Sequence, residues 1–156
     1  MSTPTARPPD VPLFSVAGTF LEALAVRDLA RLTATLTDTA HLSALVPGGL
    51  QEADGPAQIG DTVRRWFGGA QRFELVDAVV GEVGTRLHLR WRLRVHDERR
   101  GPGPFVVEQQ VYADTGPDGR IARMSLLCSG FCPEPSGPSG PSEPTVPSVT
   151  SPEVTR

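Results

Sequence analysis

The stretch that decides the fold is residues 87–95, which read Leu-His-Leu-Arg-Trp-Arg-Leu-Arg-Val. Every odd position is apolar, and every even position is His or Arg. Because successive side chains of a strand point to opposite faces, this alternation predicts a strand with one packed face and one solvated face. Trp91 stands in the middle of the apolar row, which favours a role in the core over a role in an aromatic ligand cleft.

The segments on either side of this strand continue the pattern. Further strands are predicted at 73–82, at 104–114 and at 120–130, joined by turns at Gly84-Thr85, 101–104 and 116–119. Strands joined in sequence by short Gly- and Pro-containing connections form hairpins. The second half of the chain is therefore predicted to be an antiparallel meander of four strands.

The first half has helical periodicity instead. Phe14, Ala17, Phe20, Leu21 and Leu24 form one apolar face, and after a cap or kink at Asp28 the spacing of Leu29, Leu32 and Leu36 continues it. A short strand over 41–46 ends at Pro47-Gly48-Gly49. A second helix begins near Asp54-Gly55-Pro56, repeats Ile59, Val63 and Phe67, and stops at Gly68-Gly69.

Helices followed by a long meander indicate the α+β class. We expect a strongly curved antiparallel sheet wrapped around the N-terminal helices, which makes a cone with a pocket at its open end. Proline marks the limits of this domain, since four of the 16 Pro lie in residues 1–12 and seven in 133–156. The last segment has only three apolar residues, all Val, so 1–12 and 133–156 are predicted to be disordered around a domain at 13–132.

Composition excludes several classes of function. The chain has 15 Lys+Arg, all Arg, against 18 Asp+Glu, for a net charge of -3, so binding to nucleic acid through phosphate neutralisation is not expected. No apolar run is long enough to span a membrane, and residues 1–12 do not resemble a secretory signal. With only Cys128 and Cys132, the chain is expected to be a reduced cytoplasmic protein. The spacing of its Cys and His residues predicts no metal site, and no nucleotide fingerprint is found, so no cofactor is expected.

The order of several short motifs carries a resemblance to a known family. They are the helix FLEALAVRDLARL, the strand and turn HLSALVPGG, the helix DTVRRWFGG, and the strands LHLRWRLRV, VVEQQVYAD and DGRIARM. Over residues 14–132 the chain resembles the nuclear transport factor 2-like superfamily, close to uncharacterised members of its SnoaL-like branch. The resemblance implies a cone-shaped fold, commonly dimeric through the outer sheet face, that hosts cyclases, isomerases and non-catalytic members. Where catalytic SnoaL-like members tend to carry an acid or His after the DGRI-type turn, residues 122–129 have neither.

Two carboxylates are candidates for a catalytic base, which needs a pKa raised towards neutral by apolar surroundings. Asp77 shares strand parity with Phe73 and Leu75, and would be desolvated if that parity faces inward. The alternative is an Asp at a strand bend, or one paired with an arginine of the neighbouring strand.

Glu108 shares its parity with Gln110 and Tyr112, which together could form the polar wall of a pocket. The alternative places Glu108 on the outer sheet surface, opposite the row of Arg90, Arg92 and Arg94, where cross-strand charge pairs would explain both rows.

His41 and Trp66 complete the candidate site. His41 lies beside apolar residues and could be a titratable group at the pocket opening or simply a structural histidine. Trp66, with Trp91 and Tyr112, could line a cleft for a planar ligand. The first functional hypothesis is a pocket protein that binds an apolar cyclic molecule. Its enzymatic version uses Asp77 or Glu108 as base and Tyr112 or His41 as hydrogen-bond partner. The alternative is a non-catalytic dimerisation or protein-interaction module.

Overall fold

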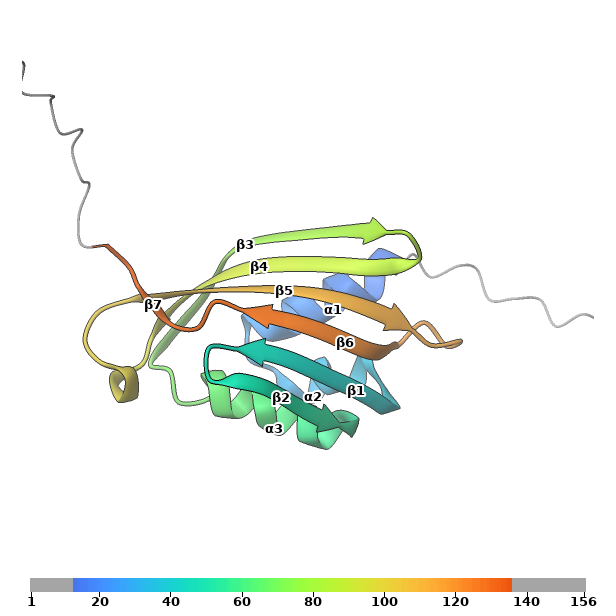
Figure 1. Ribbon diagram of the computed structural model, residues 1–156, viewed down its shortest axis with the longest axis horizontal. Helices are drawn as coiled ribbons and strands as arrows, with labels where there is room; N and C mark the ends of the chain where they lie inside the picture. Colours follow the sequence, from blue (N-terminus) through green and yellow to red (C-terminus); the bar gives the residue numbers. More distant parts are fainter. Residues whose placement is uncertain (1–12, 136–156) are drawn as a thin grey trace, which may run out of the picture.

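The computed structural model describes residues 13–135, which form one α+β domain (Figure 1). The predicted segment 1–12, and the predicted tail from residue 136 onward, lie outside the described residues. The elements in chain order are α1 (Leu13–Ala25), α2 (Leu29–Ala34), β1 (Leu36–Val46), β2 (Gly49–Asp54), α3 (Gly55–Phe67), β3 (Arg72–Val83), β4 (Arg86–His96), the 3-10 turn η1 (Glu98–Arg100), β5 (Phe105–Thr115), β6 (Ile121–Cys128) and β7 (Cys132–Pro133).

The strands form one curved sheet in the order β2-β1-β6-β5-β4-β3, and β7 adds to β5. The predicted meander from β3 to β6 is confirmed, because each of these strands pairs antiparallel with the next. The sheet as a whole is mixed, however, since β1 and β6 pair in parallel. The expectation of an entirely antiparallel sheet is wrong at this one pair. After β2 the chain crosses through α3 to the far edge of the sheet, and the returning meander brings β6 beside β1 in the same direction.

Local sequence explains most element boundaries. The side chain of Asp28 accepts a hydrogen bond from the backbone N–H of Arg31 at 3.0 Å, so the predicted cap begins α2. That helix ends at Ala34, and Leu36 is the first residue of β1 rather than the last of a helix. The β-branched Thr residues of LTATLTDTA disfavour helix and favour strand, which the leucine spacing alone did not reveal.

The helices cover one face of the sheet, which we call the inner face (Figure 1). The odd residues of β4, from Leu87 to Val95, are buried there as predicted, and so are the odd residues of β5 from Phe105 to Ala113. Phe20 of α1 packs on Trp91 with ring centroids 5.8 Å apart, and Ile59 and Phe67 of α3 fill the other side of the core.

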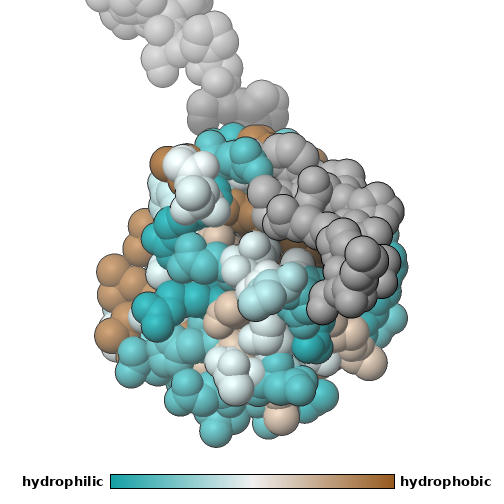
Figure 2. Space-filling view, turned by 90° about the vertical axis from the view of Figure 1, so that its right-hand side faces the viewer, coloured by the Kyte–Doolittle hydropathy of each residue, from teal (hydrophilic) through white to brown (hydrophobic). Residues whose placement is uncertain are grey.

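The two ends of the sheet differ. One end holds the β3–β4 and β5–β6 turns and is covered mostly by hydrophilic residues, with hydrophobic patches at its margins (Figure 2). The other end holds the β1–β2 turn, the last turn of α3, η1 and β7. At that end the described contacts continue past residue 132, because the backbone N–H of Glu134 donates to Pro104 and its carboxylate pairs with Arg94 at 2.8 Å.

Candidate functional site

Asp77 lies on the outer face of the sheet, opposite the helices, and the inward orientation considered for it is wrong. Leu75 pairs with Leu93, but the next paired residue, Asp77, lies opposite Arg92. The extra residue between them, Val76, is a β-bulge that reverses the parity of the rest of β3. Asp77 is therefore exposed beside an arginine instead of desolvated among apolar groups.

Glu108 also lies on the outer face, as the arginine-row alternative predicted. Its carboxylate accepts hydrogen bonds from the Nε atom of Arg92 at 2.8 Å and from a terminal nitrogen of the same guanidinium at 2.5 Å. Gln110 stands opposite Arg90. The Tyr112 ring stacks on His88 at 4.8 Å between centroids, so the polar row of β5 lies on the outer face and not on the helix side of the sheet.

His41 is bound by acidic residues of the edge strand. Its Nδ1 atom lies 2.7 Å from a carboxylate oxygen of Asp54, and its Nε2 atom lies 3.6 Å from one of Glu52. Both partners are exposed. Together with the placement of Asp77 and Glu108, this puts the polar candidates on one face of the sheet but spreads them over β1, β3 and β5. Glu108 and Gln110 share an open groove of about 460 Å³ there, which contains neither Asp77 nor His41.

The two tryptophans lie on the helix side. Trp91 is 2% exposed and belongs to the core. The interior around it is filled, since the cavity there measures only about 20 Å³. Trp66 lies near the end of α3 and is half-buried. Its indole N–H donates to the amide oxygen of Gln51 at 3.3 Å.

A larger cavity of about 540 Å³ lies at the end of the sheet that holds η1 and β7, and we call it the mouth pocket. Its lining residues are Val46, Pro47, Gly48, Gln51, Trp66, Phe67, Arg99, Arg100, Phe105, Gln109, Cys128, Gly130 and Phe131. The volume lies within the range of ordinary small-molecule sites. Of the predicted site residues, the structure places only Trp66 in this lining.

One wall of the mouth pocket is aromatic and is built around Phe131, which follows β6. The ring of Phe131 packs on Phe67 at 6.0 Å and on Phe105 at 6.4 Å between centroids. The guanidinium carbon of Arg100 lies 3.4 Å from the centre of the Phe131 ring, a close cation–π contact. The wall is therefore apolar but carries a positive charge at its edge.

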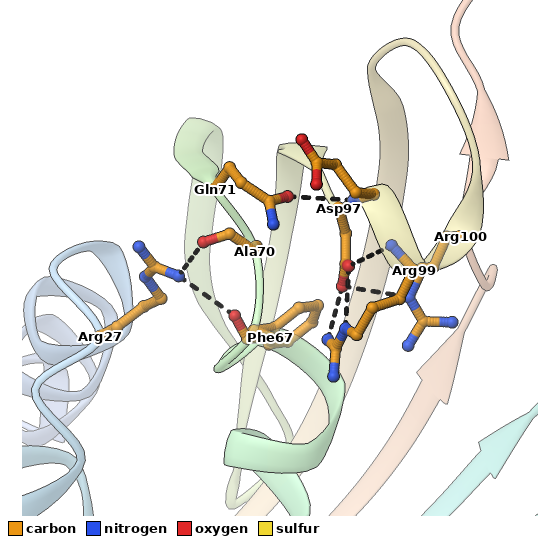
Figure 3. A network of polar contacts seen from close by, with 8 residues as sticks. Arg27, Phe67, Ala70, Gln71, Asp97, Arg99 and Arg100 are labelled. Carbon is orange, nitrogen blue, oxygen red and sulfur yellow. Dashed lines mark hydrogen bonds and ion pairs between the residues drawn. The ribbon is translucent and has the colours of Figure 1, made fainter.

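A carboxylate behind this wall holds the two arginines (Figure 3). The Asp97 side chain has no exposed surface, and it accepts hydrogen bonds from the Nε atom of Arg99 at 2.9 Å and from a terminal nitrogen at 2.6 Å. These bonds from Arg99 lower the pKa of Asp97 below its usual value, against the opposing effect of burial. Arg100 approaches the same carboxylate through its Nε atom at 3.7 Å.

The neighbouring loop is shaped around this network. A Cβ atom at Gly69 would lie 2.5 Å from the guanidinium carbon of Arg99, so glycine leaves the space that the arginine occupies. Arg27 donates to the carbonyl oxygens of Phe67 at 3.2 Å and Ala70 at 2.8 Å, which fixes the chain between α3 and β3 (Figure 3).

Gln109 borders both the mouth pocket and the small interior cavity. It is 2% exposed, and its Oε1 atom accepts the indole N–H of Trp91 at 3.0 Å. Because an indole nitrogen can only donate, this contact fixes which end of the amide is oxygen. The Nε2 atom is buried and has no hydrogen-bond partner among residues 13–135.

Sequence reasoning missed Gln109 and the Asp97 network. Gln109 is a polar residue in an otherwise apolar row of β5, and this contrast could have marked it as a candidate site residue. Arg99 and Arg100 were discounted because every basic residue of the chain is arginine.

Among the described residues, the lining of the mouth pocket contains hydrogen-bond donors and positively charged side chains, but no carboxylate and no imidazole. Within 13–135, no group of three or more His, Cys, Asp or Glu side chains is placed to hold a metal ion, and Cys128 and Cys132 are free thiols. No helix in the same part of the chain is long and apolar enough to cross a membrane.

No known protein-family model matches the chain, and no curated protein matches it. Many solved structures do. A proposed polyketide cyclase from Xanthomonas campestris is 20% identical, with a TM-score of 0.59 over 74% of this chain and 88% of that one. A proposed isomerase from Bacillus subtilis is 17% identical, with a TM-score of 0.60 over 76% and 90%.

An NTF2-like protein of unknown function from Cytophaga hutchinsonii is 12% identical, with a TM-score of 0.53 over 79% of this chain and 95% of that chain. The chain thus has the nuclear transport factor 2-like fold. The resemblance found in the sequence is confirmed at the level of the fold.

Proposed function

We propose that the protein binds an apolar cyclic small molecule in the mouth pocket. The observation that carries this proposal is a cavity of about 540 Å³ lined by Trp66, Phe67, Phe105 and Phe131, whereas the interior around Trp91 leaves only about 20 Å³. Aromatic walls with a few polar groups are typical of sites for planar ligands. The predicted cytoplasmic location is part of this proposal, since Cys128 and Cys132 would remain thiols there.

Binding is better supported than acid–base chemistry. A general base must reach the proton that it removes, but the described lining of the pocket has no carboxylate, and Asp97 behind it is occupied by Arg99. Two similar structures are a proposed cyclase and a proposed isomerase, and from them we carry over a small-molecule ligand but no reaction.

Replacing Trp66 with Ala is expected to weaken binding of the neutral dye N-phenyl-1-naphthylamine about tenfold, because one aromatic wall of the pocket is lost. Dye fluorescence, followed by titration, measures the dissociation constant. Leu50→Ala removes an exposed apolar side chain from β2 and should leave binding unchanged.

The outer-face acids provide a further control for this titration. Asp77→Asn and Glu108→Gln should not alter dye binding. A dye that binds as well to Trp66→Ala as to the wild type, or that loses affinity with the outer-face variants, would show that the ligand site is elsewhere.

A second candidate function, a homodimer formed through the outer face, is favoured by a separate observation. Leu45 pairs in register with Leu50 on one side and with Leu127 on the other, and the three are 50%, 63% and 51% exposed. Beside them, a groove of about 460 Å³ also contains Arg90 and Glu108. A patch with leucines and both signs of charge can complement a second copy of itself across a two-fold axis.

Leu127→Glu is expected to convert a dimer into a monomer, because two new glutamates, one from each copy, would be buried in the interface close to each other or to Glu108. Sedimentation equilibrium gives the mass. Val26→Glu changes a highly exposed apolar residue just after α1, away from the leucine patch, and should leave the mass unchanged. A wild-type protein that is monomeric at all accessible concentrations would exclude this candidate function.

A further inference from the structure

We propose that the ligand of the mouth pocket is a cyclic carboxylate, held at its anionic group by Arg100 and at a second oxygen by Gln109. This inference rests on the proposed function and adds the chemical class of the ligand to it. Three observations carry it: the net charge at the pocket edge, the free hydrogen-bonding capacity of Arg100, and the unpartnered amide of Gln109.

The charge at the pocket edge is positive. Arg99 and Arg100 both line the pocket and share the carboxylate of Asp97, which is outside the lining, so the lining itself carries only positive charge. Two other acids belong to the neighbouring chain. Glu98 of η1 is exposed and outside the pocket lining, and Glu134 is paired with Arg94 at 2.8 Å. Since the described lining of the pocket has no acidic residue, an anion that enters meets no like charge in that lining.

The two arginines are not equivalent. Arg99 uses its Nε atom and one terminal nitrogen on Asp97 and lies against Gly69, which fits a structural role. Arg100 is held by its flat contact with Phe131, and within residues 13–135 it makes no side-chain hydrogen bond. A guanidinium stacked on a ring presents its N–H groups at its edge, where a carboxylate binds through two parallel hydrogen bonds.

Gln109 supplies an independent reason to expect a polar ligand atom. Its Nε2 atom is buried without a partner, and an unmade hydrogen bond of this kind is costly. A water molecule in the small interior cavity would not correct this. The other lining residues there are apolar or, like Trp66 and Trp91, have their one N–H group already bonded. Because Gln109 also borders the mouth pocket, a ligand oxygen bound there is the partner that we assign to Nε2.

These features together select a ligand with a flat apolar body and oxygen acceptors. The aromatic wall takes the ring, Arg100 takes the carboxylate, and the Gln109 amide takes a further oxygen. Acceptors are required at both polar positions, because a guanidinium and the free end of the Gln109 amide can only donate.

The test compares 2-naphthoate with 2-naphthamide, which have the same ring and differ in charge, by isothermal titration calorimetry at pH 7. We expect naphthoate to bind about tenfold more tightly, with an affinity that falls as salt is raised. Arg100→Gln should remove this preference by weakening naphthoate binding about tenfold, while naphthamide binding changes less than about twofold. Arg90→Gln, on the outer face, removes an equal charge and should leave both affinities unchanged.

The outcomes separate the two proposals. Equal affinity for the two compounds, or a preference that survives Arg100→Gln, would overturn the carboxylate inference, while binding of naphthamide would still support the proposed function. Failure of both compounds and of the neutral dye to bind would overturn the proposed function itself. Because naphthamide binding also reports on folding, a loss of naphthoate binding alone cannot come from an unfolded variant.

Discussion

Trp91→Ala is expected to lower the free energy of unfolding by roughly 3–5 kcal/mol, the range for deleting a large buried aromatic side chain. Trp91 is 2% exposed and packs on Phe20. Its removal also leaves the Oε1 atom of Gln109 without its donor in a buried position. Urea denaturation followed by circular dichroism measures the change.

Arg90→Ala is the matched control, since Arg90 follows Leu89 on the same strand but points to the exposed outer face. In a monomer, the loss there should be within about 0.5 kcal/mol, as for surface substitutions in general. Equal losses at both sites would contradict the division into a packed and a solvated face. They would mean that the outer face is buried as well, as it would be in the dimer proposed above.

Asp97→Asn is expected to lower stability by about 2 kcal/mol at pH 7, because hydrogen bonds from Arg99 to a charged, fully buried carboxylate become bonds to a neutral amide or are lost. The effect should depend on pH. The pKa of Asp97 is lowered in the folded protein, chiefly by the Arg99 side chain. The ionised carboxylate therefore contributes fully to stability at pH values above the ordinary carboxyl pKa of about 4. That contribution disappears as the pH falls through the lowered folded-state pKa.

Denaturation at several pH values between about 2 and 7 tests this dependence. The wild-type protein should lose stability on acidification more steeply than Asp97→Asn, and the two should converge at the lowest pH. Asp118→Asn serves for comparison. Like Asp97, Asp118 pairs with an arginine, Arg120, at 2.6 Å, but Asp118 is exposed, so its replacement should lower stability less. Parallel curves for the wild type and Asp97→Asn would contradict an ionised, stabilising Asp97.

The elements with strong local patterns were predictable from the sequence, and the features set by strand pairing were not. The alternation of residues 87–95 determines which side of β4 is buried, and the Gly-Pro start and Gly-Gly end frame α3. The bulge at Val76 has no comparable local signal, because both parities of β3 are largely apolar. Because the bulge cannot be recognised in the sequence, the sequence alone could not decide on which face Asp77 lies.

The candidate site was harder to predict for the same reason. A polar row such as Glu108, Gln110 and Tyr112 can line a pocket or cover a surface, and only the position of the helices distinguishes the two. Gln109 could be recognised as a candidate site residue only from the structure, which places its Nε2 atom in a buried position without a hydrogen-bond partner among residues 13–135. Arg100 acquired its role from Phe131, a residue distant in sequence whose ring it covers.

The parallel pairing of β1 with β6 has a consequence for how the domain is made. These two strands lie near opposite ends of the domain sequence, yet they are neighbours in the sheet and share the register of Leu42 with Met124. During synthesis on the ribosome, β1 therefore has only β2 as a sheet partner until β6 has emerged. Such distant pairings slow folding, since a long loop must close before they form. The nascent chain should thus acquire protection from proteases late and abruptly, when translation has passed β6.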